Sequence, residues 1–156
     1  GEYVVDVNGV TEKFSLSADN TITIDSKSGT DIFPHEGSLL AGNHSLFIDF
    51  NQKDYERALE EDKTIMLYFY AKWCPVCKYE LTSATIPAFN QYQGENIIGF
   101  RVNYNDSDTS KYENNLAKDF GVVYQHTKVF VKDGKIISVT PNEWTKENYL
   151  DEFTHN

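Results

Sequence analysis

Two cysteines at the junction between an apolar segment and a helical one constrain this chain more than any other feature. Thr64 to Tyr70 is a nearly unbroken apolar run, which is typical of a strand covered on both faces of a sheet. Cys74 and Cys77 follow at once, and a helix is predicted from just after Cys74 to about Asn90, with Pro87 bending or breaking it. The sequence therefore places a Cys-x-x-Cys pair where a central strand gives way to a helix.

Strand and helix signals alternate on both sides of this junction. Asn51 is expected to cap a helix that runs through Glu61, and Gly121 to end a helix that begins at Ser110. Asp133-Gly134 is a hairpin turn signal. Further strands are expected over 46–50, 97–103, 127–131 and 135–140, and a closing helix over 145–153 with Tyr149, Leu150 and Phe153 facing inward. These strand–helix–strand units followed by a hairpin predict an α/β fold with a central mixed β-sheet flanked by helices.

The first 45 residues have a different pattern, in which short polar and β-branched stretches alternate. Residues 3–7 and 10–16 flank Asn8-Gly9 and predict a β-hairpin with a type I′ turn, and 21–25 is a further short strand. Residues 26–43 are expected to form a loop or linker. We therefore divide the chain into an N-terminal β extension with linker (1–45) and a globular domain (46–156). Because the first residue is Gly rather than Met, we expect a chain from which a leader was removed.

Charge and composition exclude several classes of function. The chain has 156 residues, with 24 acidic against 14 basic side chains and a formal net charge of −10. Nucleic-acid binding needs clustered Lys and Arg, and an acidic chain is repelled by an anionic membrane surface. The sequence contains no apolar run near the roughly 18 residues that a spanning helix requires. The sequence is therefore that of an acidic, globular protein, and its two cysteines are the first residues to consider.

The position of the two cysteines predicts different roles for them. Free amide groups and the dipole at a helix N-terminus favour the thiolate of Cys74, and Pro75 fits the first helical turn, where its missing N–H costs nothing. Cys77 comes one turn later, close enough to close a disulfide with Cys74. Cys74 is then expected to be the exposed attacking thiolate, and Cys77 the thiol that resolves the mixed disulfide. Half a zinc site has the same spacing, but the chain has no second cysteine pair to complete one.

Three segments of the chain resemble the thioredoxin superfamily. The segment 70–78 (Tyr-Ala-Lys-Trp-Cys-Pro-Val-Cys-Lys) is similar to the active-site segment of that family, and 120–122 and 129–135 are similar to its later strand and hairpin. The resemblance covers about residues 46–155. Residues 77–80 and 103–106 are closer to the extracytoplasmic domains of bacterial membrane-linked thiol–disulfide carriers than to cytosolic thioredoxin. The resemblance implies a thioredoxin fold and thiol–disulfide exchange with protein substrates.

The sequence departs from that family at three points. His126 stands where the family usually has a cis-proline, and since a cis bond without proline costs about 3–4 kcal/mol, we expect a trans Gln125–His126 bond in a reshaped loop. Tyr68 stands where many members carry a buried Asp that handles the proton of the resolving thiol, and a phenol cannot replace a carboxylate at neutral pH. The dipeptide between the cysteines is Pro-Val instead of Gly-Pro, so the family's redox potential does not transfer.

His126 has three interpretations. It is a polar loop residue without chemistry, or its imidazole lies against the sulfurs, where it stabilises a thiolate or accepts a proton. In the third interpretation it completes a metal or iron–sulfur site with Cys74 and Cys77.

Other residues near the cysteines have weaker signals. Trp73 is expected to pack beside Cys74 and to form part of a docking surface. Val76, Gln125 and Thr127 are expected to bind the substrate, whose extended backbone pairs with the loop 125–127. The side chains of Lys78 and Glu80 are expected on the exposed face of the helix.

We therefore predict a protein thiol–disulfide oxidoreductase that uses Cys74 and Cys77 and needs no further cofactor or metal. Its partners are protein thiols or disulfides and an upstream redox partner, with a membrane involved only through a removed anchor. The alternatives are a thioredoxin-like binding or assembly module with little turnover, and the metal or iron–sulfur binder. Because no spare thiols can be misoxidised, we expect an extracytoplasmic location, with the cytoplasm as the alternative.

Overall fold

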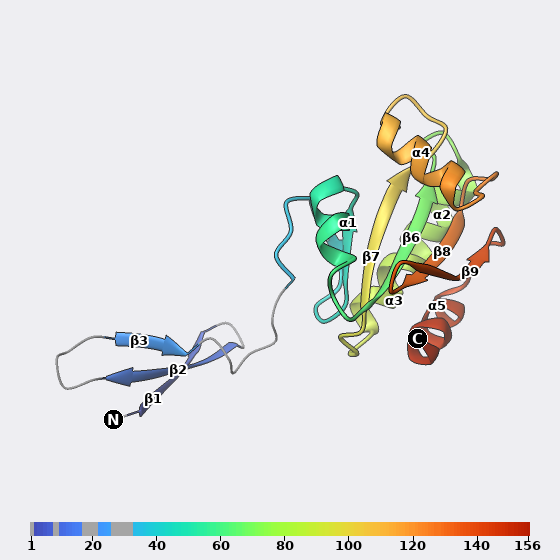
Figure 1. Ribbon diagram of the computed structural model, residues 1–156. Coiled ribbons are helices and arrows are strands. Elements are labelled where there is room, and N and C mark those ends of the chain that lie inside the picture. Colours follow the sequence, from blue (N-terminus) through green and yellow to red (C-terminus); the bar gives the residue numbers. More distant parts are fainter. Residues whose placement is uncertain (1, 8–9, 17–21, 26–32) are drawn as a thin grey trace. The chain divides into compact units, whose positions relative to one another are not determined.

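The structure is a computed structural model, which describes residues 2–7, 10–16, 22–25 and 33–156. The chain forms two compact units, Gly1–Phe33 and Pro34–Asn156. Figure 1 shows the elements of both units with their labels.

The first unit is a three-stranded antiparallel sheet with the strand order β1-β2-β3. The strands are β1 (Glu2–Val7), β2 (Val10–Leu16) and β3 (Ile22–Asp25). Val7 pairs with Val10, which confirms the predicted hairpin. The pairing of β3 with β2 confirms the further short strand. The predicted Asn8-Gly9 turn lies outside the described residues.

The second unit is built around a six-stranded mixed sheet with the order β4-β5-β7-β6-β8-β9. Its strands are β4 (Leu39–Ala41), β5 (Leu46–Asp49), β6 (Thr64–Tyr70), β7 (Ile97–Asn103), β8 (Thr127–Lys132) and β9 (Lys135–Thr140). Strands β5, β7 and β6 are parallel neighbours, whereas β4, β8 and β9 pair antiparallel. The predicted mixed sheet, with a hairpin at its C-terminal edge, is confirmed.

Strand β6 is buried along its whole length because helices cover both faces of the sheet. Met66, Tyr68 and Tyr70 belong to the core under one helical layer. The intervening side chains of β6 point to the other face, where Phe69 packs edge-on against Tyr104. Gly99 on the neighbouring strand leaves room for Phe89, whose ring a side chain at this position would strike.

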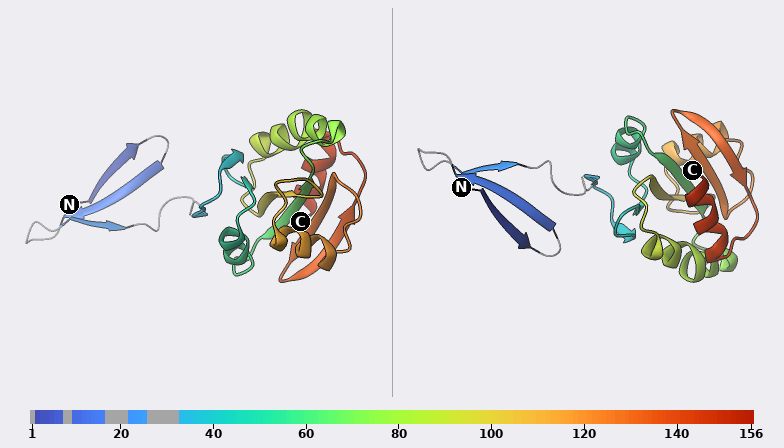
Figure 2. Two further views of the ribbon diagram at one scale, coloured as in Figure 1. Left: turned by 90° about the horizontal axis from the view of Figure 1, so that it is seen from above. Right: turned by 90° about the horizontal axis from the view of Figure 1, so that it is seen from below.

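Five α-helices and one π-helical turn form the two layers, which Figure 2 shows on either side of the sheet. They are α1 (Gln52–Ala58), α2 (Pro75–Glu80), the π-helical turn η1 (Leu81–Thr85), α3 (Ile86–Gln91), α4 (Lys111–Asp119) and α5 (Lys146–His155). Helices α2, α3 and α5 lie on one face, and α1 and α4 lie on the other (Figures 1 and 2). No helix in the described ranges is long and apolar enough to cross a membrane.

Three local expectations differ from the structure. Strand β4 lies within 26–43, which the sequence favours as loop or linker, and it pairs with β5 at the sheet edge. Helix α1 ends at Ala58 instead of Glu61. Of the two effects expected of Pro87, a break of the helix is wrong, because the chain stays helical from Pro75 to Gln91 and the turn before the proline widens to π geometry. A wider turn accommodates a residue that lacks an N–H and crowds the preceding turn.

Candidate active site

Cys74 is the N-cap of helix α2. Its backbone is extended, and its Sγ accepts a hydrogen bond from the backbone N–H of Cys77 at 3.2 Å. Pro75 occupies the first helical turn, as expected. Cys74 is therefore an N-cap in which sulfur takes the place of the usual oxygen acceptor.

Cys77 lies on the inner face of α2, one turn after Cys74. Both cysteines are free and buried, and the Cys77 side chain is completely so. The expectation that Cys74 is exposed is wrong, because its sulfur caps the helix at the Cys77 N–H and belongs to the apolar core beside Tyr68. Burial raises the pKa of the Cys77 thiol to about 12, an effect that the nearby backbone amides of Ala71 and His126 only partly offset. Cys77 therefore holds its proton at neutral pH until another group assists its removal.

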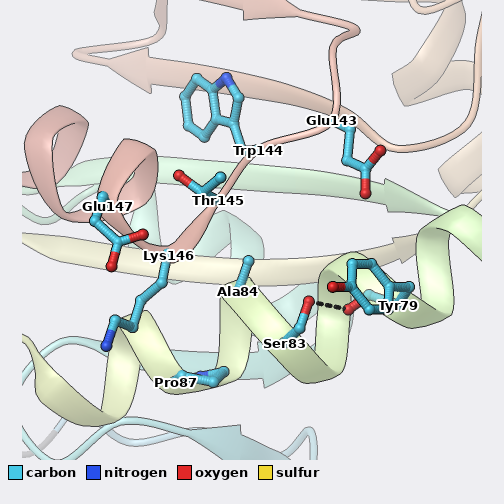
Figure 3. A pocket seen from close by; sticks show the side chains of 9 residues that line it. All are labelled: Tyr79, Ser83, Ala84, Pro87, Glu143, Trp144, Thr145, Lys146 and Glu147. Carbon is cyan, nitrogen blue, oxygen red and sulfur yellow. Dashed lines mark hydrogen bonds between the residues drawn. The ribbon is translucent and has the colours of Figure 1, made fainter.

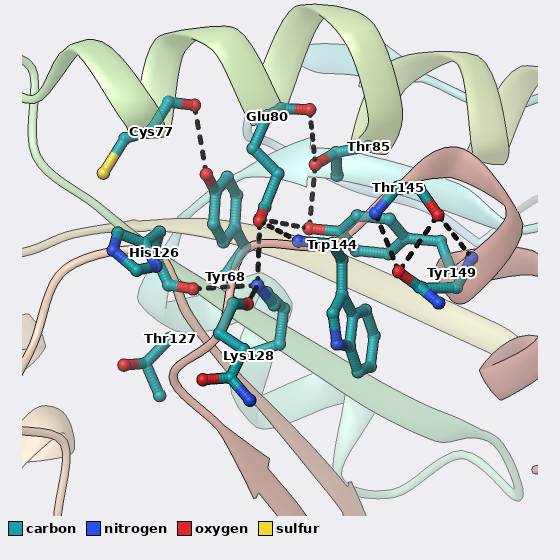
Figure 4. Close-up of polar contacts among 12 residues, drawn as sticks. Tyr68, Cys77, Glu80, Thr85, His126, Thr127, Lys128, Trp144, Thr145 and Tyr149 are labelled. Carbon is teal, nitrogen blue, oxygen red and sulfur yellow. Dashed lines mark hydrogen bonds and ion pairs between the residues drawn. The ribbon is translucent and has the colours of Figure 1, made fainter.

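The loop before β8 faces Cys77. The Gln125–His126 peptide bond is trans, as expected, and His126 adopts a left-handed backbone with φ of 53°. Its backbone N–H donates to the Phe69 carbonyl at 2.7 Å, which joins the loop to the end of β6. The Nδ1 atom of His126 is buried without a hydrogen-bond partner, and the Cys77 sulfur points toward this residue in Figure 4. An unpaired ring nitrogen can accept or donate a proton.

Tyr68, on strand β6, contacts helix α2 from the side of the sheet. Its hydroxyl donates to the Cys77 carbonyl at 3.0 Å, inside a fully buried site. Burial raises the pKa of this phenol far above its usual range, and the Glu80 carboxylate adds to the shift. Tyr68 is consequently a neutral hydrogen-bond donor here and cannot take a proton from Cys77.

Trp73 is fixed beside the cysteines by the loop after β7. Its indole N–H donates to the Asn105 carbonyl at 2.8 Å, while 52% of the side chain remains exposed. The Asp106 carboxylate accepts from the Lys72 backbone N–H at 2.9 Å. The ring of Trp73 is thus held in position and still open to a partner.

Exposed apolar side chains gather on the segments next to the dithiol. Val76 and Tyr79 lie on the outer face of α2. Val123 and Tyr124 lie just before the His126 loop. Exposed apolar side chains on these two segments, together with Trp73, are typical of a protein-binding surface.

The three residues predicted to bind the substrate, Val76, Gln125 and Thr127, differ in how far they are exposed. Val76 is exposed and Gln125 is half-buried. The Thr127 side chain is buried, its hydroxyl donates to the Tyr124 carbonyl, and its backbone pairs with Phe69. The structure therefore brings Val76 and Gln125 to the surface but not the Thr127 side chain.

The expectation that Glu80 lies on an exposed helix face is wrong. Glu80 is fully buried and pairs with the ammonium of Lys128, also fully buried, at 3.0 Å. Glu80 follows Cys77 by three residues, so helical periodicity puts both side chains on one face, and this spacing could have indicated its burial. Lys78, by contrast, is exposed as expected.

The structure gives no geometric support for a metal site. Among the described residues, no three His, Cys, Asp or Glu side chains come together in a way that could hold a metal ion. Cys74, Cys77 and His126 do not form such a set.

A pocket of about 550 Å³ lies on the outer side of η1, between this turn and the segment before α5 (Figure 3). Its lining includes Tyr79, Ser83, Trp144 and Lys146. The Ser83 hydroxyl donates a hydrogen bond to the Tyr79 carbonyl. Neither cysteine lines the pocket. It is therefore distinct from the dithiol site.

Known proteins are similar to this chain over the second unit. The family model described as thioredoxin matches residues 47–155. Thioredoxin H4 of Arabidopsis thaliana is 31% identical over 85 residues, which are 53% of this chain and 62% of that protein. Thioredoxin H5 of the same plant is 30% identical over 104 residues, which are 65% of this chain and 76% of that protein. The chain thus spans less than two thirds of the first relative's length.

Solved structures show the same fold at low sequence identity. The structure of Trxlp from Edwardsiella tarda aligns with a TM-score of 0.56 at 21% identity, covering 67% of this chain and 95% of that one. The thioredoxin from Aeropyrum pernix aligns with a TM-score of 0.57 at 19% identity, covering 79% of this chain and 96% of that one. These similarities show the architecture of the domain that holds the two cysteines.

Proposed function

Because this chain belongs to the thioredoxin family, we propose that it exchanges disulfides with protein substrates through Cys74 and Cys77. The observation that carries this proposal is the geometry of the pair. Cys74 caps the helix beside the exposed Trp73, and Cys77 lies one turn behind it with a protonated, buried thiol. One cysteine is placed to meet a substrate and the other to release it.

In the first step, the Cys74 thiolate attacks one sulfur of a substrate disulfide. The substrate S–S bond breaks, a Cys74–substrate disulfide forms, and the leaving thiolate takes up a proton. In the second step, Cys77 loses its proton and attacks the Cys74 sulfur, which expels the second substrate thiolate. Two electrons pass to the substrate, and the Cys74–Cys77 pair is left as a disulfide.

His126 is the group we assign to the proton of Cys77. Its Nδ1 atom is buried and unpaired on the loop that the Cys77 sulfur faces, whereas the Tyr68 phenol is neutral. An unpaired ring nitrogen on a loop that faces a thiol is a group of the kind that serves as a general base. In this proposal His126, and not Tyr68, accepts the proton of Cys77.

The exposed apolar side chains around the pair form the substrate surface in this proposal. Trp73, Val76, Tyr79, Val123 and Tyr124 are exposed on the segments that carry the cysteines and the His126 loop, so a substrate that reaches the dithiol meets apolar side chains. The substrate class is therefore a protein or peptide disulfide with apolar neighbours. Small hydrophilic disulfides gain little from such a surface.

An extracytoplasmic location is part of the proposal, because the chain has only the two cysteines of the site and no other thiol that an oxidising compartment could misoxidise. The direction of exchange follows from the potential of the pair. A value near about −270 mV makes the protein a reductant, and one near about −120 mV makes it an oxidant.

Reduction of insulin disulfides with dithiothreitol as the electron donor tests the proposed activity. We expect turnover by the wild-type protein and none by Cys74→Ser. Cys77→Ser should accumulate a mixed disulfide with the substrate that mass spectrometry detects. Lys78→Ala is the control, because it changes an exposed residue of the same helix and should keep full activity. A folded wild-type protein that neither reduces insulin nor oxidises a reduced protein would instead be a binding module.

A further inference from the structure

A buried charged cluster that takes no part in the steps above lies behind Cys77. The Glu80 carboxylate and the Lys128 ammonium are both fully buried, and Lys128 Nζ donates to each Glu80 oxygen at 3.0 Å (Figure 4). Glu80 belongs to α2, the helix of Cys77, while Lys128 belongs to β8, two residues after His126. The pair therefore spans the two segments that meet at the Cys77 sulfur.

The Glu80 carboxylate has no free acceptor position. Besides Lys128, one of its oxygens accepts from the Trp144 backbone N–H at 2.6 Å, and the other from the Tyr149 hydroxyl at 2.7 Å. A carboxylate with two donors on each oxygen is an anchor and is not available as a base for the neighbouring thiol. Its role must come from what it holds.

Lys128 extends the anchor to the His126 loop. Its ammonium also donates to the His126 carbonyl at 2.9 Å and to the Asn142 carbonyl, and it lies over the ring of Trp144 at 5.1 Å from the centroid. Burial lowers the pKa of Lys128, and the Glu80 carboxylate opposes that shift. One ammonium thus joins the active-site helix, the loop facing the dithiol and the segment before α5.

The conformation of the His126 loop must be stabilised by contacts with the rest of the domain. A left-handed backbone is unfavourable for a residue with a side chain, and the loop has no proline to stiffen it. Buried ion pairs are weak contributors to net stability, since desolvation of both charges offsets their attraction. The presence of this pair is better explained by the geometry that it fixes.

We infer that Glu80 and Lys128 are positioning residues for the second step of exchange, because they hold the His126 loop against the sulfur of Cys77. This inference rests on the proposed function. Loss of the pair should slow the attack of Cys77 on the mixed disulfide and leave the first attack by Cys74 unaffected, since Cys74 is held by its own helix.

Stopped-flow reaction of the reduced protein with one equivalent of Ellman's reagent separates the two steps. Thionitrobenzoate is released once when Cys74 attacks and once when Cys77 displaces it from the mixed disulfide. We expect Lys128→Met to slow the second release by about tenfold or more, because a displaced reacting group loses rate steeply. Glu80→Gln should slow it less, since the amide oxygen still accepts from Lys128. The first release should stay within about twofold of wild type in both variants.

Two further variants separate positioning from folding and from net charge. Lys132→Met removes the same charge from the same strand at a half-buried site, where the partner Asp62 is exposed, and should leave both phases unchanged. Glu80→Gln combined with Lys128→Met removes both buried charges, so it should unfold at a higher temperature than Lys128→Met alone while its second phase stays slow. A second phase at the wild-type rate in Lys128→Met, or in the folded double variant, would overturn the inference and leave the proposed function intact. A wild-type protein without a second phase would overturn both.

Discussion

At the scale of single residues, the two cysteines differ because of what surrounds each sulfur. Cys74 is at the helix end beside an exposed tryptophan, whereas Cys77 is enclosed by α2, β6 and the His126 loop. Burial penalises the thiolate form of Cys77 and so keeps this thiol from competing for substrate. The same burial makes the second step dependent on a neighbouring group that accepts the proton.

The raised pKa of Cys77 makes the reduced protein lose stability at alkaline pH. Folding moves this pKa from 9.0 to about 12, so the unfolded chain releases the proton first as the pH rises. The free energy by which the protonated Cys77 thiol favours the folded state is fully present below pH 9. Above pH 9 it is lost progressively, at up to about 1.4 kcal/mol for each pH unit. Urea unfolding under reducing conditions at pH 8 and pH 10 should show a smaller loss of unfolding free energy for Cys77→Ala than for wild type.

Cys74 is present in both of these proteins, so its contribution cancels in the comparison. Burial also raises the pKa values of Tyr68 and Tyr149, and their effect begins above pH 10 in both proteins. Equal losses for wild type and Cys77→Ala would contradict the assigned cause.

The imidazole of His126 should be needed for the second chemical step. His126→Asn removes the ring but keeps a residue that tolerates the left-handed backbone. We expect the second release of thionitrobenzoate to slow by about a hundredfold near neutral pH, as is typical when a general base is lost. His155→Asn, an exposed position on α5, is the control with the same chemical change. An unaltered second phase would leave His126 with a conformational role only.

At the scale of elements, periodicity predicts most of the fold. Strand β6 is recognisable from its apolar run, all of which is buried in the structure, and α4 from Ser110, which forms a capping box with Glu113. Gly121 ends that helix region in a left-handed conformation, as expected. Each of these signals is local, so a single sequence contains it.

The elements that sequence reasoning missed depend on distant partners. Strand β4 has three residues and forms because β5 offers it an unpaired edge. Lys128 sits in a strand of otherwise apolar type, and its partner Glu80 lies 48 residues earlier in the chain. The residues next to Lys128 in the sequence do not indicate an ion pair. The helical spacing between Cys77 and Glu80, by contrast, indicates that the Glu80 side chain is buried. The dithiol was therefore predictable and its supporting cluster only in part.

At the scale of the whole molecule, the proposed redox chemistry is assigned to the second unit. Its sheet, its two helical layers and both cysteines come from the chain after residue 33. The segment before β5 is bound into this unit, because the backbone N–H groups of Glu36 and Gly37 both donate to the buried Asp54 carboxylate at 2.8 Å. Arg57 also donates to the Pro34 carbonyl at 2.6 Å.

Two shortened chains test where the redox domain begins. A chain that starts at Phe33 keeps β4 and both donors to Asp54, so its urea midpoint and insulin reduction should match those of the full chain. The second chain starts at Ser45 or Leu46, near the boundary expected from the sequence. In this chain the Asp54 carboxylate lacks both backbone donors, and β5 lacks its edge partner β4. We expect it to lose about 3 kcal/mol or more of unfolding free energy, because a buried charged group without its hydrogen bonds is costly. Equal stability of the two shortened chains would show that β4 and the donors to Asp54 contribute little and that the domain begins at the boundary expected from the sequence. A less stable second chain would place the start of the domain before β4.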